Sequence, residues 1–142
     1  MVVNEKKLNE FIEKAVSEWG AAYGALLTFV GDRLGLFKAM AGAGVLTPEE
    51  LAKKTETHPR IIKEWLAAQT AGGFVTYNPS AGKYTLPQEQ AFALTDENSP
   101  AYIAGFYQAL AGLFLDQEKI IEAFRTGKGL GWGDHHHYLF EG

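Results

Sequence analysis

The chain has 142 residues, the size of one ordinary domain. With 46% apolar and 21% charged residues it can bury a sizeable core, which excludes wholesale disorder. The absence of cysteine excludes a disulfide framework, a thiolate nucleophile and a cysteine-ligated zinc site. Thirteen basic against 17 acidic residues give a net charge of −4, which argues against a general polyanion binder but leaves room for a local basic patch.

The N-terminal region predicts helices. The opening stretch MVVNEKKLNE lacks the apolar segment of a secretory signal, so we expect a cytoplasmic protein. Over residues 8–19 apolar side chains recur at the spacing of one helical face, which predicts an amphipathic helix. Gly20 and Gly24 loosen this pattern, and a second helix is therefore predicted over residues 21–40.

The middle of the chain predicts a winged helix-turn-helix. Residues 47–50 (TPEE) form a capping box that opens a short helix, and Pro59 opens another. Strand-like runs at 74–77 and 83–86 flank a turn-rich connection of hairpin length. Helix, turn, helix and hairpin in this order indicate a winged helix over residues 45–87.

The last third predicts more helix. A short helix is expected over residues 88–94, and Ser99 and Pro100 are expected to open a long one over 101–125. The first half of that helix, 101–115, is too short to span a bilayer and is apolar nearly all round. A helix without a polar face needs partners on several sides, so we expect a second chain or a further domain to cover it.

We therefore predict a mainly α fold in four parts. Residues 1–44 form N-terminal dimerisation helices, and residues 45–87 form a winged helix with a small hairpin wing. Residues 88–126 form C-terminal helices that also serve dimerisation, and 127–142 form a Gly/His-rich junction. The expected partner is a second copy of the chain, held through both sets of helices.

The charge distribution bears on DNA binding, because the second helix of such a motif commonly enters the major groove. Residues 45–90 hold five basic and five acidic side chains, so the motif is neutral. Phosphate neutralisation supplies most non-specific affinity for DNA, and a neutral motif supplies little of it. If the chain were instead a winged-helix transcriptional regulator, Arg60, Lys63 and Lys83 would contact the DNA.

Few residues suggest chemistry directly. The histidines at 135–137, preceded by Asp134, are interpreted as a polar loop, because neighbouring side chains on an extended chain point to alternate sides; no metal site is predicted. The alternate glycines of 127–133 follow a helix and lack the strand that a phosphate-binding loop requires. No catalytic constellation can be assembled, so no catalytic residue is predicted.

Several segments together suggest a family: VGDRLGLF at 30–37, LTPEELA at 46–52, RIIKEWL at 60–66, GGFV at 72–75, FRTG at 124–127, GWGDH at 131–135 and LFEG at 139–142. The first four resemble the N-terminal region of bacterial S-adenosylmethionine-dependent methyltransferases, of the small-molecule O-methyltransferase type. Those enzymes carry a winged-helix dimerisation domain ahead of a Rossmann-like catalytic domain. The last three segments resemble the junction into that catalytic domain.

The resemblance implies a dimerisation and substrate-lid domain, with Trp132, Asp134, His135 and His136 near the substrate. The family's cofactor site, a strand followed by a glycine-rich turn, has no counterpart here, so we predict no cofactor-binding residue. S-adenosylmethionine is implied for a full-length protein, and no catalysis is expected from these 142 residues alone. A remaining alternative is a module that binds an apolar small molecule through the aromatic residues of 102–114 and Trp132.

Overall fold

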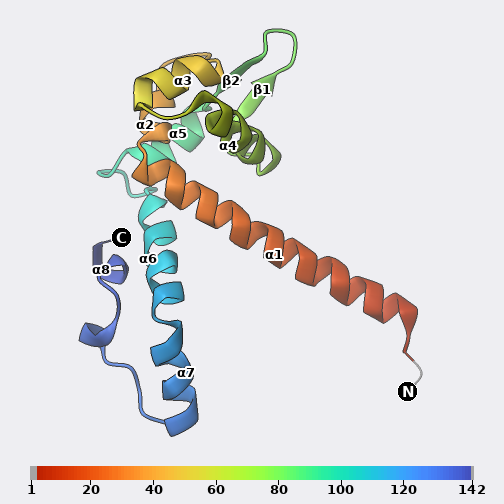
Figure 1. Cartoon of the computed structure of the whole chain (residues 1–142), viewed down its shortest axis with the longest axis vertical. Coiled ribbons are helices and arrows are strands. Elements are labelled where there is room, and N and C mark those ends of the chain that lie inside the picture. The colour runs from red at the N-terminus through yellow and green to blue at the C-terminus, as the bar shows by residue number, and fades with distance from the viewer. Residues whose placement is uncertain (1–2, 142) are drawn as a thin grey trace.

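The computed structural model describes residues 3–141 and is mainly helical, with one two-stranded antiparallel hairpin (Figure 1). The predicted fold class, a winged helix-turn-helix flanked by helices, is confirmed. The elements in chain order are α1 (Glu5–Arg33), α2 (Leu36–Met40), α3 (Pro48–Thr55), α4 (Pro59–Ala71), β1 (Thr76–Asn78), β2 (Lys83–Thr85), α5 (Gln88–Thr95), α6 (Ala104–Leu115), α7 (Gln117–Thr126), the 3-10 turn η1 (Trp132–Asp134) and α8 (Tyr138–Glu141).

Helix α1 is a single helix of 29 residues, so the predicted division at residue 20 is wrong. The Asn4 side chain accepts a hydrogen bond from the Lys7 N–H (3.1 Å) and caps the start. A glycine inside a helix costs about 1 kcal/mol of stability relative to alanine. Gly20 and Gly24 each carry this cost, but the long helix α1 continues through both of them. The helix ends where Gly35 adopts a left-handed conformation (φ +67°). Its N-terminal half projects away from the rest of the molecule (Figure 1).

The winged helix follows the predicted local signals. The Thr47 hydroxyl accepts from the Glu50 N–H (3.2 Å) while the Glu50 carboxylate accepts from the Thr47 N–H (2.7 Å), completing the capping box of α3. Strand β1 pairs with β2 so that Tyr77 lies opposite Tyr84. Leu46 forms an additional bridge to Tyr84, which ties the segment before α3 to the wing.

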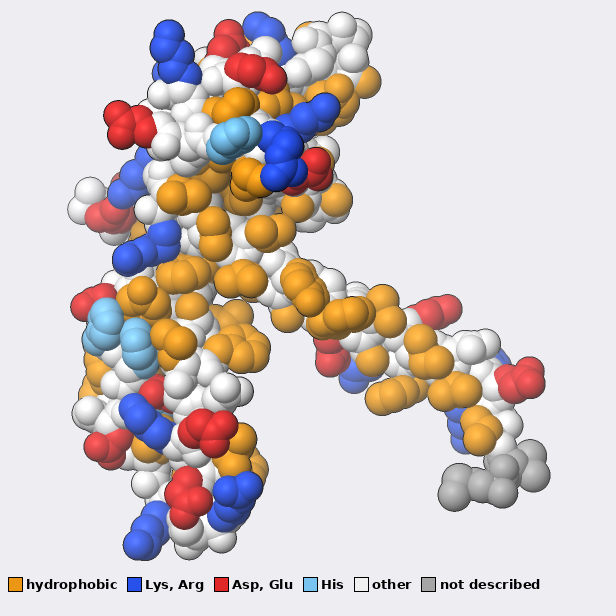
Figure 2. All heavy atoms as spheres, in the orientation of Figure 1, with side chains coloured by type: hydrophobic (Ala, Val, Ile, Leu, Met, Phe, Trp, Pro, Cys, Tyr) orange, Lys and Arg blue, Asp and Glu red, His pale blue; other side chains and the backbone are white. Residues whose placement is uncertain are grey.

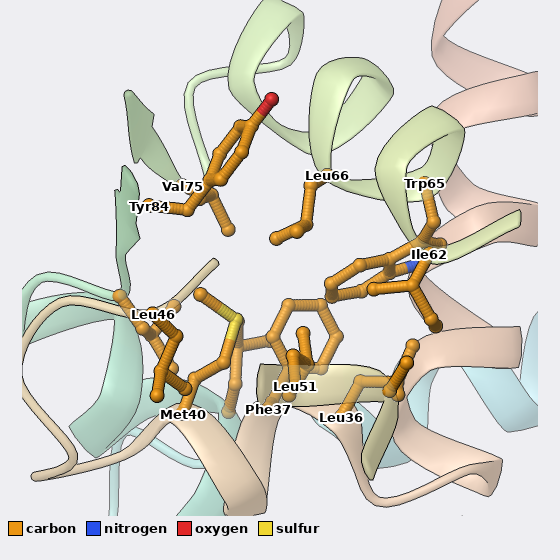
Figure 3. Close-up of a cluster of buried hydrophobic side chains, with 13 residues drawn as sticks. Leu36, Phe37, Met40, Leu46, Leu51, Ile62, Trp65, Leu66, Val75 and Tyr84 are labelled. Carbon is orange, nitrogen blue, oxygen red and sulfur yellow. The ribbon is translucent and has the colours of Figure 1, made fainter. Parts of the chain in front are cut away.

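One apolar core fills the winged helix and also takes in α2 (Figure 3). Trp65 of α4 joins this core to α1: its indole N–H donates to the Leu27 carbonyl (2.8 Å), and its ring meets Phe37 edge-on at 5.1 Å. The ring lies against Gly31, where a Cβ atom would be 2.9 Å from Trp65 Cε2 and 3.1 Å from Phe37 Cε2. The core side chains are Leu36, Phe37, Met40, Leu46, Leu51, Ala52, Ile62, Trp65, Leu66, Val75, Tyr84, Leu86 and Leu94.

The predicted long helix over 101–125 is wrong in two respects. Turns occupy the residues after Ser99, and α6 begins only at Ala104. Asp116 then leaves helical geometry (φ −86°, ψ 7°) and separates α6 from α7. Its carboxylate is buried and accepts a hydrogen bond from the His136 N–H, in the loop that follows α7.

Much apolar surface stays uncovered in this chain. Phe106 and Phe114 of α6 are 72% and 63% exposed, and apolar side chains follow one another along α1 (Figure 2). None of the helices in the described part of the chain is both long and apolar enough to cross a membrane.

We predict that Gly31→Ala destabilises the protein by about 1–3 kcal/mol, because the added methyl group overpacks the contact with Trp65. Urea denaturation measures the change. Gly20→Ala is the matched control: nothing lies within 4 Å of its added Cβ, so helix propensity should raise stability by about 0.5–1 kcal/mol. Equal effects of the two substitutions would contradict the packing argument.

Candidate functional site

A groove of about 570 Å³ lies between α1 and α6, with α8 at one end. Its walls are almost wholly apolar, and several of the lining aromatic residues are exposed in this chain. Such a volume suits either a drug-sized apolar molecule or the side chains of another helix. The lining residues are Trp19, Ala22, Tyr23, Leu26, Phe29, Ala111, Phe114, Leu115 and Tyr138.

Tyr138 connects the groove to the loop of residues 127–137, which we call the histidine loop. Its ring lies 5.7 Å from that of Phe29, and the Arg33 guanidinium lies over it at 5.6 Å, within the range of a cation–π contact. The His136 ring meets the same tyrosine edge-on at 4.6 Å. Through Tyr138, the histidine loop is held against α1.

Asp116 anchors this loop from the other side. Although the residue is only 2% exposed, its carboxylate has three partners: Lys119 Nζ (2.9 Å), the His136 N–H (2.6 Å) and His135 Nδ1 (3.1 Å). The hydrogen bond from Lys119 and then that from the His136 N–H lower the pKa of Asp116 to about 2, against the opposing effect of burial. The carboxylate is therefore ionised at neutral pH and holds the loop in place.

The four residues predicted to lie near a substrate all belong to this loop, and the structure brings three of them together. The Trp132 ring meets that of His135 edge-on at 6.5 Å. His135 and His136 share Asp116. Asp134 accepts a hydrogen bond from the Gly131 N–H (3.0 Å), and its carbonyl accepts one from Lys119. Trp132 is largely exposed and packs on Phe140, with ring centres 5.0 Å apart. Their proximity to a substrate stays a prediction.

Sequence reasoning missed Asp116, Tyr138 and Phe29 as parts of this site. Asp116 lies 19 and 20 residues from its histidine partners, so no local spacing indicates the contact. The available signal was a single carboxylate directly after an apolar helix, a position where burial requires a partner.

The histidine run does not converge on one point. His135 contacts Asp116, whereas His137 Nδ1 contacts the Glu141 carboxylate (3.0 Å). Within residues 3–141 no group of three or more histidine, aspartate or glutamate side chains is arranged to hold a metal ion.

The residues named for DNA contact lie on the winged helix with acidic neighbours. Arg60 and Lys63 are exposed on α4, and Lys83 is half-buried on β2. Lys83 contributes, after the Thr47 hydrogen bond, to lowering the pKa of Glu50, which places it beside a carboxylate. On the face drawn in Figure 2, acidic and basic side chains are mixed over the winged helix.

The described residues do not fit an S-adenosylmethionine cradle. The strands found within residues 3–141 are β1 and β2 of the wing, and the segment after them leads into α5 without a glycine-rich turn. The glycines of 127–133 follow α7 and join it to η1. No binding of the methyl donor is therefore assigned to these residues.

Comparison with known proteins agrees with the architecture. Residues 21–96, more than half of the chain, match the Rv2258c-like winged HTH domain, and the chain belongs to this family. No curated protein matches the chain.

Solved structures share the fold at low identity. The mitomycin 7-O-methyltransferase MmcR aligns over 89% of the chain with 20% identity and a TM-score of 0.72. PigF with SAH aligns over 86% (19% identity, TM-score 0.64), and the N,N-8-amino-8-demethyl-D-riboflavin dimethyltransferase RosA from Streptomyces davawensis over 89% (16% identity, TM-score 0.63). The chain spans 37%, 38% and 35% of these three structures, respectively.

We predict that Asp116→Asn removes an acid-dependent part of the stability. Because the pKa of Asp116 is lower in the folded protein (about 2) than the usual value of 3.8, its stabilising effect is fully present above pH 3.8. It is lost as the pH falls from about 4 to about 2. Urea midpoints at pH 7, 4 and 2.5 should fall more steeply in the parent than in the variant.

Glu122→Gln on exposed α7 is the control, since its carboxylate reaches only Arg125, at 4.0 Å. It should retain the parent's pH dependence. An Asp116→Asn variant with the parent's full acid sensitivity would contradict the role given to this carboxylate.

Proposed function

We propose that this chain acts as the dimerisation and substrate-lid domain of an S-adenosylmethionine-dependent small-molecule methyltransferase. The winged helix supplies a rigid body, α1 and α6 supply the dimer surface, and the loop of residues 132–137 lies near the substrate. The chain itself contributes no methyl-donor site and no methyl transfer. The family match and the shared fold of MmcR, PigF and RosA support this proposal.

The observation that carries the proposal is the uncovered apolar face of α1. Along residues 5–24 every residue is exposed, yet the helix presents Phe11, Val16 and Trp19, which are 67%, 56% and 64% exposed. Contiguous apolar patches of this kind on a stable protein mark interaction surfaces. A second copy carries the same face, so one interface covers both.

The lid role rests on the construction of the groove. Its far wall contains Tyr138, and this residue is linked through His136 to the loop fixed by Asp116. An apolar wall with a few fixed polar groups at one end is a common form of small-molecule site. This arrangement also accommodates the alternative of an apolar ligand bound without a catalytic domain.

We expect the chain to be a dimer at micromolar concentration in size-exclusion chromatography with light scattering. Val16→Asp places a charge on the apolar face of α1 and should raise the dimer dissociation constant at least about a hundredfold. Ser17→Asp, on the opposite side of the same helix, is the matched control and should leave the dimer intact. A strict monomer at all concentrations would refute the dimerisation role.

Titration calorimetry tests the absence of methyl-donor binding. S-adenosylmethionine added to the 142-residue chain should give no binding heat, because the described residues form no strand and glycine turn to hold it. Micromolar binding would overturn that part of the proposal.

A further inference from the structure

A second groove, of about 770 Å³, lies on a different side of α1, where this helix packs against α4 (Figure 1). Its floor consists of residues with little or no side chain, among them Gly20 and Gly24 of α1 and Ala68 and Gly72 at the end of α4. A Cβ atom added at Gly20 or Gly24 would have nothing within 4 Å, so the space in front of both glycines is open. The buried Thr28 hydroxyl also lines the groove, and it is satisfied because it donates to the Gly24 carbonyl (2.9 Å).

The side chain of Gln69 is buried in this groove without a hydrogen-bond partner. Gln69 is only 3% exposed, and outside its helix it accepts hydrogen bonds from the Phe74 and Val75 N–H groups through its backbone carbonyl. Its side-chain amide bonds to no residue within 3–141. In this part of the chain every wholly inaccessible polar side-chain atom has a partner, so the Gln69 amide is still accessible, and it is the groove that it faces. A nearly buried amide left unpaired lowers stability, which points to a ligand that pairs with it.

The amide determines which chemical group fits. A glutamine amide presents a carbonyl acceptor beside an NH₂ donor, and it pairs with two bonds to an edge that carries one donor and one acceptor side by side. The N–H and C=O of a lactam form such an edge. None of the lining residues carries a charge, so an ionised ligand would lose its hydration without gaining an ion pair.

Aromatic side chains favour a planar ligand. Phe74 and Tyr107 line the groove with their rings edge-on, 6.4 Å apart. Burial raises the pKa of Tyr107, so its hydroxyl is uncharged at neutral pH. A flat ring can lie on the glycine and alanine floor and meet these aromatic side chains at its edge or face.

From these observations we propose that the groove between α1 and α4 binds an uncharged, planar aromatic lactam whose N–H and C=O pair with the side-chain amide of Gln69. The site lies apart from the groove between α1 and α6, although Tyr23 lines both, and it contains no residue of the histidine loop. All of its residues come from one chain, so this proposal does not depend on the proposed dimerisation role.

Titration of the ¹⁵N-labelled chain with 2-quinolone, a bicyclic aromatic lactam, tests the site by nuclear magnetic resonance. The Gln69 side-chain NH₂ and the backbone N–H groups of Gly24 and Gly72 should shift together, with a dissociation constant of about 1 mM or lower. Quinoline lacks the lactam, and N-methyl-2-quinolone lacks its N–H donor. Both should bind at least about tenfold more weakly, because they leave part of the amide unpaired.

A matched pair of substitutions distinguishes the two grooves. Gly24→Leu fills the open space of the groove between α1 and α4 and should weaken 2-quinolone binding at least about tenfold. Ala22→Leu adds a side chain of the same size about 160° around the same helix, in the groove between α1 and α6, and should leave the affinity unchanged.

Gln69→Met tests the amide itself. The variant keeps an unbranched side chain of similar length but cannot pair with a lactam, so it should bind 2-quinolone at least about tenfold more weakly and quinoline as the parent does. Because the amide has no partner within residues 3–141, the urea midpoint should not fall. This variant and the ligand series keep the test decisive if Gly24→Leu does not fold.

The site is supported if the Gln69 side-chain NH₂ shifts with 2-quinolone and if Gly24→Leu and Gln69→Met, but not Ala22→Leu, weaken the binding. Loss of binding in Ala22→Leu alone places the ligand in the other groove and overturns the proposal. Equal affinities for quinoline and 2-quinolone contradict the pairing with Gln69. A Gln69→Met variant with a lower urea midpoint and unchanged affinity makes the amide structural, and an absence of shifts up to the solubility limit of 2-quinolone also refutes the site.

Discussion

The contact between Trp65 and α1 determines how the rest of the molecule is arranged. The indole lies in the winged-helix core against Phe37, while its N–H donates to the Leu27 carbonyl and its ring lies on Gly31. Only a residue without a Cβ permits this approach. Because the contact involves the C-terminal third of α1, it sets the direction of the whole helix, whose N-terminal half extends beyond the body (Figure 1). The groove with α6 and the exposed apolar face both depend on that direction.

A second constraint on the fold is electrostatic and comes from the buried carboxylate of Asp116, between α6 and α7. A buried carboxylate is stable only with compensating partners, and here Lys119, His135 and the His136 N–H provide them. These contacts lie at the junction of α6 and α7 and hold the histidine loop near Tyr138. The charge that stabilises the fold is thus the same group that positions the loop carrying the predicted substrate-proximal residues.

The uncovered surface of α1 and α6 connects structure with function. The core lies within the winged helix, and within residues 3–141 the apolar side chains in the N-terminal half of α1 stay largely exposed. Burial of apolar area drives association as it drives folding, at about 25 cal/mol per Å². In the proposed function this exposed surface of α1 and α6 is the one that a second copy covers.

The sequence alone determined the winged helix, because its signals are local: the capping box at Thr47, the proline at the start of α4, the turn between the strands and the apolar periodicity of each helix. By resemblance it also predicts that residues 132–136 lie near a substrate, and its charge balance argues against DNA binding; both stay predictions. It did not predict that α1 continues through Gly20, because a glycine lowers helix propensity by about 1 kcal/mol without by itself ending a long helix. It also did not predict the buried position of Asp116, because His135 and the His136 N–H meet that carboxylate only when the chain folds back from α7. Contacts between residues far apart in sequence leave no local pattern, and only the tertiary structure decides them.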